Sequence, residues 1–164
     1  MQPRLPPSSF LKTPDELYMC QALKEAWKAF DNNEVPVGAV VVFQDRLIAR
    51  GYNQVETLQD ATAHAEMLVI GAASAYLSNW RLNECTLYTT IEPCLMCAGA
   101  SILSRLKRVV WGAPDIRHGG GGSLTNLFAL PHPIHTVEFT SSVLTDWCSL
   151  PIKQFFQKRR AEEV

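Results

Sequence analysis

The apolar run VGAVVVF at residues 37–43 restricts the possible folds of this chain more than any other stretch. It has the length of a strand, and its nearly continuous apolar character is typical of a strand that is buried on both faces. Gln44-Asp45 then predicts a turn, and RLIARGY at 46–52 alternates as the second strand of a hairpin. The sequence therefore predicts a buried hairpin over residues 37–52.

Helical patterns lie on both sides of this hairpin. Thr13-Pro14-Asp15-Glu16 has the residues of a capping box with proline at the first helical position, and the apolar spacing that follows predicts a helix to about residue 31. The other expected elements are helices at about 63–77 (apolar on most sides and therefore largely buried), 94–104 and about 144–160, and strands at 86–91, 108–112 and 136–140. The order β-β-α-β-α-β predicts an α/β fold, with a mostly parallel sheet, one antiparallel hairpin and helices on both faces.

Composition narrows the class of protein. The chain has 164 residues, of which 47% are hydrophobic and 19% charged, and we expect one domain over 1–164 with residues 1–12 as a loose lead-in. The apolar runs are strand-length and cut by charges, so no membrane span is expected. The first residues contain no apolar core of signal-peptide length, which predicts a cytoplasmic protein. Because the net charge is −1, any nucleic-acid binding must come from a local patch.

The stretch EPCLMC at 92–97 places Cys94 and Cys97 three residues apart at the start of a predicted helix. A disulfide is disfavoured because cytoplasmic thiols stay reduced, and because five cysteines fit no simple disulfide framework. The spacing puts both sulfurs on one helical face, and the free N–H groups of the first turn favour the thiolate form. Together with His64, thirty positions upstream, they form a ligand set suited to tetrahedral Zn²⁺.

His64 lies in the triplet His64-Ala65-Glu66, which poses a geometric problem. Side chains two residues apart on a helix point about 200° apart, so His64 and Glu66 cannot share one helical face. We therefore expect the metal beyond the helix N-terminus, where first-turn side chains and the N–H of Ala65 converge. Two helix N-termini would then meet at one zinc. Three protein ligands leave a fourth position for water, and Glu66 is the base expected to remove its proton.

Other interpretations of these residues are open at this point. A His-x-Glu triplet is common by chance, and a lone Cys-x-x-Cys can be redox-active or structural. A structural zinc would need a fourth ligand from the remaining candidates, which are Cys85, Cys148, His118, His132 and His135.

HAE at 64–66 together with PCLMC at 93–97 resembles the signature of the cytidine-deaminase-like zinc deaminases. Further segments are similar to the bacterial tRNA-specific adenosine deaminases from about residue 17 to 161: VPVGAVVV, GYN, TAHAEM, LYTTIEPCLMCAGASILSR, VVWGAPD, GGGGSL and FFQKRR. The resemblance implies a cytidine deaminase-like, three-layer α/β/α sandwich with a mixed five-stranded sheet. It also implies one Zn²⁺ per subunit and a homodimer whose active sites take residues from both subunits.

The activity implied by the resemblance is hydrolytic deamination of the wobble adenosine in a tRNA anticodon stem-loop to inosine. Water on zinc would attack C6 of adenine, Glu66 would carry protons to the ring nitrogen and to the leaving amine, and ammonia would depart. Asn53 would hydrogen-bond the base, Ala65 would offer its backbone N–H, and Asp115 would lie near the neighbouring ribose. The anticodon loop would be held by residues of the last helix, namely Phe156, Lys158, Arg159 and Arg160.

Each of these substrate roles has a plainer alternative. Asn53 follows a strand and is suited to a local cap, and Asp115 beside Pro114 is suited to starting a turn. The basic and aromatic residues at the end of the last helix also fit its solvated and buried faces, with Phe155 the expected core residue. A phosphate and stacking patch for single-stranded RNA would use the same residue types.

Two other functions share the zinc motif. One is deamination of a free base or nucleoside, such as guanine or cytosine, which would not need the GAPD and FFQKRR segments. The other is a non-catalytic, zinc-stabilised RNA-binding module, which would not need Glu66. Four consecutive glycines at 119–122 and the apolar segment TNLFALPHPIH depart from the family pattern.

Overall fold

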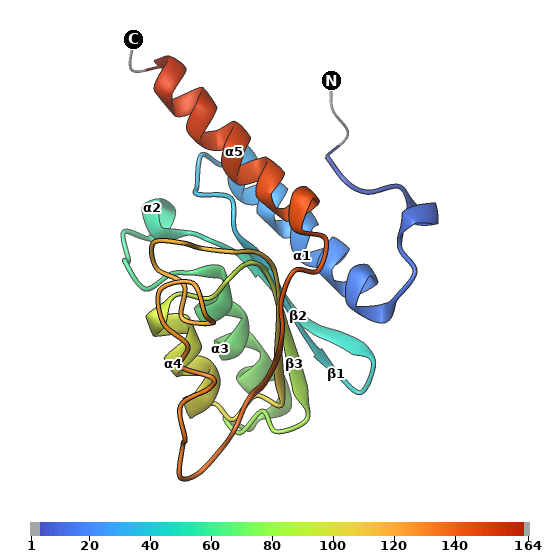
Figure 1. Ribbon diagram of the computed structural model, residues 1–164, viewed down its shortest axis with the longest axis vertical. Helices are drawn as coiled ribbons and strands as arrows, with labels where there is room; N and C mark the ends of the chain where they lie inside the picture. The colour runs from blue at the N-terminus through green and yellow to red at the C-terminus, as the bar shows by residue number, and fades with distance from the viewer. Residues whose placement is uncertain (1–3, 163–164) are drawn as a thin grey trace.

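The computed structural model describes residues 4–162, which form one five-stranded sheet with helices on both of its faces (Figure 1). The helices are α1 (Pro14–Asp31), α2 (Val55–Leu58), α3 (Ala65–Leu77), α4 (Leu95–Leu103) and α5 (Thr145–Glu162), and a short 3-10 helix, η1 (Ser8–Phe10), precedes them. The strands are β1 (Gly38–Phe43), β2 (Arg46–Tyr52), β3 (Cys85–Ile91), β4 (Arg108–Ala113) and β5 (Glu138–Thr140). The α/β class, the five strands and the mixed sheet are confirmed.

The strands lie in the order β2-β1-β3-β4-β5. The predicted hairpin pairs β1 with β2, and β3-β4 and β4-β5 pair in parallel, as expected. A second antiparallel pair, β1 with β3, was not expected. It arises because β1 lies between β2 and β3 and runs against both. Only β1 is reversed, so the other four strands point to the same edge of the sheet.

The nearly continuous apolar run of β1 has the predicted cause. Ala39 and Val41 pack in one core cluster with residues of α3 and α4, while Val40 and Val42 pack in another with Met19 of α1. All four are buried. Alternate residues of β1 therefore serve opposite layers of the sandwich, α3 and α4 on one face and α1 and α5 on the other (Figure 1).

The first helix begins as predicted and lies unusually close to the sheet. Thr13 and Glu16 form the complete capping box at its N-terminus. A Cβ atom on Gly38, the first residue of β1, would lie 2.1 Å from the carbonyl oxygen of Ala22. Glycine at this position therefore lets the backbones of α1 and β1 approach each other.

Two expectations for the ends of the chain need correction. Residues 4–11 are not a loose lead-in: the indole N–H of Trp27 donates to the carbonyl of Arg4 at 2.6 Å, and Leu5 packs on the Trp27 cluster. The buried indole needs an acceptor, and the lead-in backbone supplies it. Residues 1–3 lie outside the described residues. The last strand is shorter than predicted, because β4 pairs only with Glu138–Thr140.

The expectation of a largely buried α3 was also wrong. One side of α3 packs on the sheet, but Gly71, Ala72, Ala75 and Tyr76 are exposed. Sequence reasoning also missed α2, which has only four residues. No helix among the described residues is both long enough and apolar enough to cross a membrane.

The direction of the strands brings the functional candidates to one edge. β2, β3 and β4 end there and are followed by Asn53, by the segment 92–97 and by Asp115. Because β1 runs the other way, it begins at the same edge, directly after the segment 34–37. Ligands of open α/β sheets bind outside the carboxyl ends of the strands, so this edge is where a site is expected.

Candidate active site

A cavity of about 510 Å³ opens at this edge of the sheet. Its volume lies in the range of about 300–1,000 Å³ that is typical of small-molecule sites. Its lining combines apolar side chains with carboxylates, an amide and imidazoles: Glu34, Val35, Val37, Asn53, Val55, Glu56, His64, Ala65, Glu66, Ile91, Glu92, Cys94, Asp115 and His118. The cavity thus gathers most of the predicted site, because its lining includes Asn53, His64, Ala65, Glu66, Cys94 and Asp115. The remaining zinc ligand, Cys97, lies against His64.

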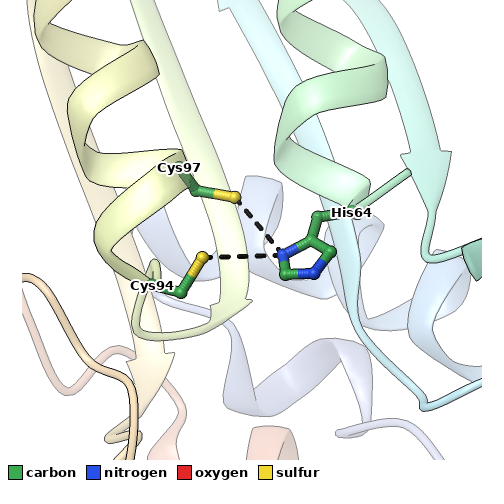
Figure 2. A group of neighbouring side chains, drawn as sticks. All are labelled: His64, Cys94 and Cys97. Atoms are coloured by element: carbon green, nitrogen blue, oxygen red, sulfur yellow. Dashed lines mark hydrogen bonds between the residues drawn. The ribbon is translucent and has the colours of Figure 1, made fainter. Parts of the chain in front are cut away.

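The three predicted zinc ligands point toward one another (Figure 2). Nδ1 of His64 lies 3.6 Å from Sγ of Cys94 and 3.6 Å from Sγ of Cys97. A tetrahedral ion with Zn–S bonds of about 2.3 Å and a Zn–N bond of about 2.05 Å would separate sulfur from nitrogen by about 3.6 Å. The spacing of the ligand atoms therefore fits Zn²⁺ without rearrangement.

The positions of these ligands at the helix ends resolve the geometric problem posed by His64 and Glu66. His64 is the N-cap of α3 and Cys94 is the N-cap of α4, one residue before each helix begins. Both have extended backbone angles, and neither side chain makes a capping hydrogen bond. An N-cap side chain is not bound to the helical 100° step, so His64 and Glu66 can both face the cavity. Two helix N-termini meet at the site, as predicted (Figure 2).

The surroundings of the two cysteines shift their pKa values in opposite directions. A hydrogen bond donated by the Cys97 thiol lowers the pKa of Cys94 to about 4, despite partial burial, and His64 adds to the effect. The same hydrogen bond, followed by burial, raises the pKa of Cys97. A bound divalent cation would hold both cysteines as thiolates, because the thiolate is the metal-binding form.

The alternative zinc ligands lie outside the ligand group, although His118 lines the same cavity. Within residues 4–162, His64, Cys94 and Cys97 are the one group of three or more such side chains that could hold a metal. Cys148 packs against Gly112, and Nε2 of His135 lies 2.7 Å from the carbonyl of Leu106. The three-ligand site therefore keeps an open position toward the cavity, which is typical of catalytic rather than structural zinc.

Glu66 is buried beside the ligands and is not one of them. Its side chain is 3% exposed and lines the cavity, and the Thr89 hydroxyl donates to Oε1 at 3.2 Å. Burial raises the pKa of the Glu66 carboxyl above its ordinary range. A carboxyl with a raised pKa that lines the cavity beside the ligands is suited to moving protons.

Asn53 is held by a residue that sequence reasoning did not single out. Glu34 is fully buried, and its carboxylate accepts from Nδ2 of Asn53 at 3.4 Å and from the backbone N–H of Thr57 at 2.7 Å. A carboxylate only accepts, so it binds the NH₂ end of the Asn53 amide and leaves the carbonyl oxygen free to face the cavity. The Asn53 side chain is therefore not a local cap. Glu34 also accepts hydrogen bonds from backbone N–H groups in the first turn of α2.

Asp115 does start a turn, which was the plainer of its two predicted roles. Its Oδ1 accepts from the backbone N–H groups of Arg117 and His118, at 3.1 and 3.2 Å. Its Oδ2 lies 3.5 Å from Nδ1 of His118, and both residues line the cavity. The turn therefore brings a carboxylate and an imidazole to the rim.

The basic end of α5 lies against the end of α1 (Figure 1). Lys158 Nζ donates to Oδ1 of Asn33 at 3.3 Å, and Arg159 donates to the Asn33 carbonyl at 3.4 Å. Glu34, the next residue, lines the cavity. Phe155 is 5% exposed and packs on Phe30, as predicted for the core residue, whereas Phe156 is 44% exposed. Two exposed cations of α5 thus contact the residue that precedes a cavity residue.

Among the cavity residues that sequence reasoning passed over are two buried glutamates, Glu34 and Glu92. Each borders a strand-forming stretch, VPVGAVVV after Glu34 and TLYTTI before Glu92. Acidic residues are almost never fully buried unless they are paired, so this setting was a usable signal.

Comparison with known proteins places the chain among deaminases. A family model, the cytidine and deoxycytidylate deaminase zinc-binding region, matches residues 12–113. The tRNA-specific adenosine deaminase of Bacillus subtilis (strain 168) is 48% identical over 151 residues, which cover 92% of this chain and 94% of that protein.

Solved structures agree with this placement. One structure comes from work on A-to-I editing by tRNA:A34 deaminases at the wobble position of transfer RNA. It matches with a TM-score of 0.79 and 38% sequence identity, and the match covers 82% of this chain and 98% of that chain. The guanine deaminase from Nitrosomonas europaea matches with a TM-score of 0.72 and 26% sequence identity, and the match covers 88% of this chain and 85% of that chain.

The ligand set predicts which substitutions release the metal. His64→Ala and Cys97→Ser should each lose the zinc that the purified parent carries, because two ligands no longer fix the ion. His118→Ala should retain one ion per chain, since His118 lies outside the ligand group. Elemental analysis of dialysed protein measures both. Zinc loss in His118→Ala would contradict the three-ligand assignment.

Proposed function

Since the chain belongs to the cytidine and deoxycytidylate deaminase zinc-binding family, we propose that it deaminates adenosine at the wobble position of a tRNA anticodon to inosine. The observation that carries the proposal is the set of His64, Cys94 and Cys97 at a cavity with the buried, non-ligating Glu66 beside it. The 48% identity to a tRNA-specific adenosine deaminase over nearly the whole of both chains supports the substrate.

The reaction consumes one water and releases ammonia, so it needs a nucleophile and a proton carrier. Zinc held by the three ligands would supply a Lewis acid that lowers the pKa of a water to near neutrality. Glu66 accepts one proton of the attacking water and delivers it to the ring nitrogen. It then takes the second proton from the hydroxyl now on C6, as the carbonyl forms, and passes it to the departing amine, which leaves as ammonia. Its burial keeps these transfers away from bulk solvent.

The base is oriented by groups that surround Glu66. The amide of Asn53, fixed in one orientation by Glu34, presents its carbonyl oxygen and its second N–H to the purine edge, which is the pairing that Asn makes with adenine. The backbone N–H of Ala65, in the first turn of α3, supplies a further donor beside the reactive carbon. Asp115 at the rim accepts from a ribose hydroxyl of the adjacent nucleotide.

The RNA outside the cavity is held by the end of α5. Phe156, Lys158, Arg159 and Arg160 are exposed, and Lys158 and Arg159 contact Asn33, next to the cavity residue Glu34. Cations neutralise phosphates and an exposed ring stacks on an unpaired base, which is how single-stranded RNA loops are bound. This local patch supplies the positive charge for binding phosphates that the overall net charge of −1 does not supply.

A homodimer is supported by the outer sides of α3 and α4. Tyr76 on α3 and Leu95 and Leu103 on α4 are 60%, 45% and 71% exposed, next to exposed glycine and alanine residues of α3. Exposed apolar patches of this kind mark interaction surfaces. Leu95 directly follows the ligand Cys94, so a partner bound here would lie beside the active site.

The first prediction concerns Glu66. Glu66→Gln should lower the rate of inosine formation in an anticodon stem-loop by about 10²–10⁴, because the proton carrier is lost, while elemental analysis still finds zinc. Glu56→Gln, which removes another carboxylate of the cavity lining, should stay close to the parent. Free adenosine, guanine and cytidine are assayed beside the stem-loop. Turnover of a free base without inosine in RNA would move the function to nucleobase metabolism.

A second prediction concerns the basic end of α5. Arg159→Ala with Arg160→Ala should raise the KM for the stem-loop about tenfold and flatten the log–log salt dependence by about 1.4, the value for two phosphate contacts with single-stranded RNA. Arg46→Ala with Lys107→Ala removes the same charge at the opposite edge of the sheet and should change neither quantity. Equal effects of the two pairs would argue against a local RNA patch.

A third prediction concerns the dimer. Sedimentation of the parent at micromolar concentration should give twice the chain mass, and Leu103→Glu on α4 should give the monomer, because a charge cannot be buried unpaired at the interface. Leu17→Glu, an equally drastic change at a 51% exposed leucine on α1, should leave the dimer intact. A monomeric parent would refute the dimer.

A further inference from the structure

Glu92 is a buried carboxylate to which the mechanism above assigns no role. It is 2% exposed, directly precedes Pro93 and the ligand Cys94, and lines the cavity wall. Its Oε1 accepts from the backbone N–H groups of Gly121 and Ser123 at 3.0 and 2.9 Å. Its Oε2 accepts from the backbone N–H of Asp115 at 3.1 Å and from the Ser123 hydroxyl.

All of these donors lie on one segment, residues 114–125, which follows β4 and contains the four glycines. Three backbone N–H groups and one hydroxyl of this segment donate to the two oxygens of Glu92, as in a backbone anion-binding nest. Four donors from a single segment tie that segment to the end of β3.

The glycines permit this closure. A Cβ on Gly119 would lie 2.4 Å from Cδ and from Oε1 of Glu92 and 2.5 Å from the carbonyl oxygen of Asp115, while a Cβ on Gly121 would lie 2.6 Å from the ring of Trp111. Any side chain at these positions would push the segment away from the carboxylate. The glycine run therefore acts as a tight wrapping around Glu92 and not as a flexible linker.

The wrapped segment carries the rim of the active site. Asp115 and His118 line the cavity, Gly119 pairs with the ligand Cys94 as an isolated bridge, and Gly120 donates to the Pro93 carbonyl at 2.7 Å. Glu92, with four hydrogen bonds, thus joins the substrate rim to the metal ligand loop alongside these two backbone contacts. If the segment opened, Asp115 and His118 would leave the cavity, while Glu66 and the ligands on α3 and α4 would stay in place.

We propose that Glu92 is a positioning residue for RNA binding, which holds residues 114–125 closed so that Asp115 and His118 are preset against the nucleotide next to the reactive adenosine. This inference rests on the proposed function, because it names the substrate contact that the rim makes. Ordering the rim before substrate arrives lowers the entropic cost of binding. The role therefore appears in KM and not in the chemical step.

The test uses Glu92→Gln in the full zinc-loaded chain. Glutamine keeps the shape but turns an NH₂ group toward backbone donors, so the segment loses part of its anchor. Hydrogen exchange at the amides of Asp115, Gly121 and Ser123 should rise at least tenfold, and the KM for the stem-loop about tenfold. Zinc content and kcat should stay within about twofold of the parent. Glu84→Gln, an exposed glutamate before β3, is the control and should change none of these.

Gly119→Ala provides an independent arm, because it keeps the carboxylate but blocks the wrapping, and it should reproduce the raised exchange and raised KM. Ser123→Ala removes one of the four donors and should give a smaller change in the same direction; it decides the matter if Glu92→Gln does not fold. Unchanged hydrogen exchange in Glu92→Gln would show that Glu92 does not anchor the segment. Raised exchange with an unchanged KM would show that the anchored segment does not position the RNA. Loss of zinc would show that Glu92 supports the metal ligand loop instead. A parent that forms no inosine would refute the proposed function, whereas the exchange result would still stand.

Discussion

Three ligand atoms must reach one metal ion from two helices, and this requirement sets how α3 and α4 lie on the sheet. His64 and Cys94 each stand one residue before their helix begins, and Nδ1 of His64 lies 3.6 Å from both sulfurs. The helices can start that close together only because β2 and β3 end at the same edge, on either side of the reversed strand β1. The strand order of the sheet therefore makes the metal site possible. It also places the first turns of both helices, with their free N–H groups, around the cavity.

Three buried glutamates lie around this cavity, and their surroundings give them different chemistry. Glu34 and Glu92 accept from backbone N–H groups, the first at the start of α2 and the second on the glycine-rich segment. Bound in this way they act as fixed acceptors that hold other parts of the site. Glu66 has the Thr89 hydroxyl as its side-chain partner and a raised pKa caused by burial. Identical carboxyl groups thus serve as anchors or as a proton carrier according to the donors that surround them.

The surfaces outside the cavity are divided between the two helical layers. The layer of α3 and α4 carries the exposed apolar side chains Tyr76, Leu95 and Leu103, and α5 carries the exposed cations Lys158, Arg159 and Arg160. The surfaces proposed for the partner subunit and for the RNA thus lie on different helical layers. The apolar segment after the glycines has an internal role, because Phe128 is buried and stacks on Trp111.

Sequence by itself determined the elements and the chemistry that depends on residue type and local spacing. The unbroken apolar run of β1 and the capping box at Thr13 follow from near-neighbour patterns, and both were placed correctly. The residue types of His64, Cys94 and Cys97 predicted a ligand set, and the fold brings these three side chains together. Only the tertiary structure decided which distant groups meet. β1 lies between β2 and β3, Glu34 binds Asn53, and Glu92 gathers donors from 23 to 31 residues away. The residues in these contacts are far apart in the sequence, and their spacing follows neither the helical nor the strand repeat. Strand order at the sheet edge brings them together, and sequence periodicity cannot predict that order.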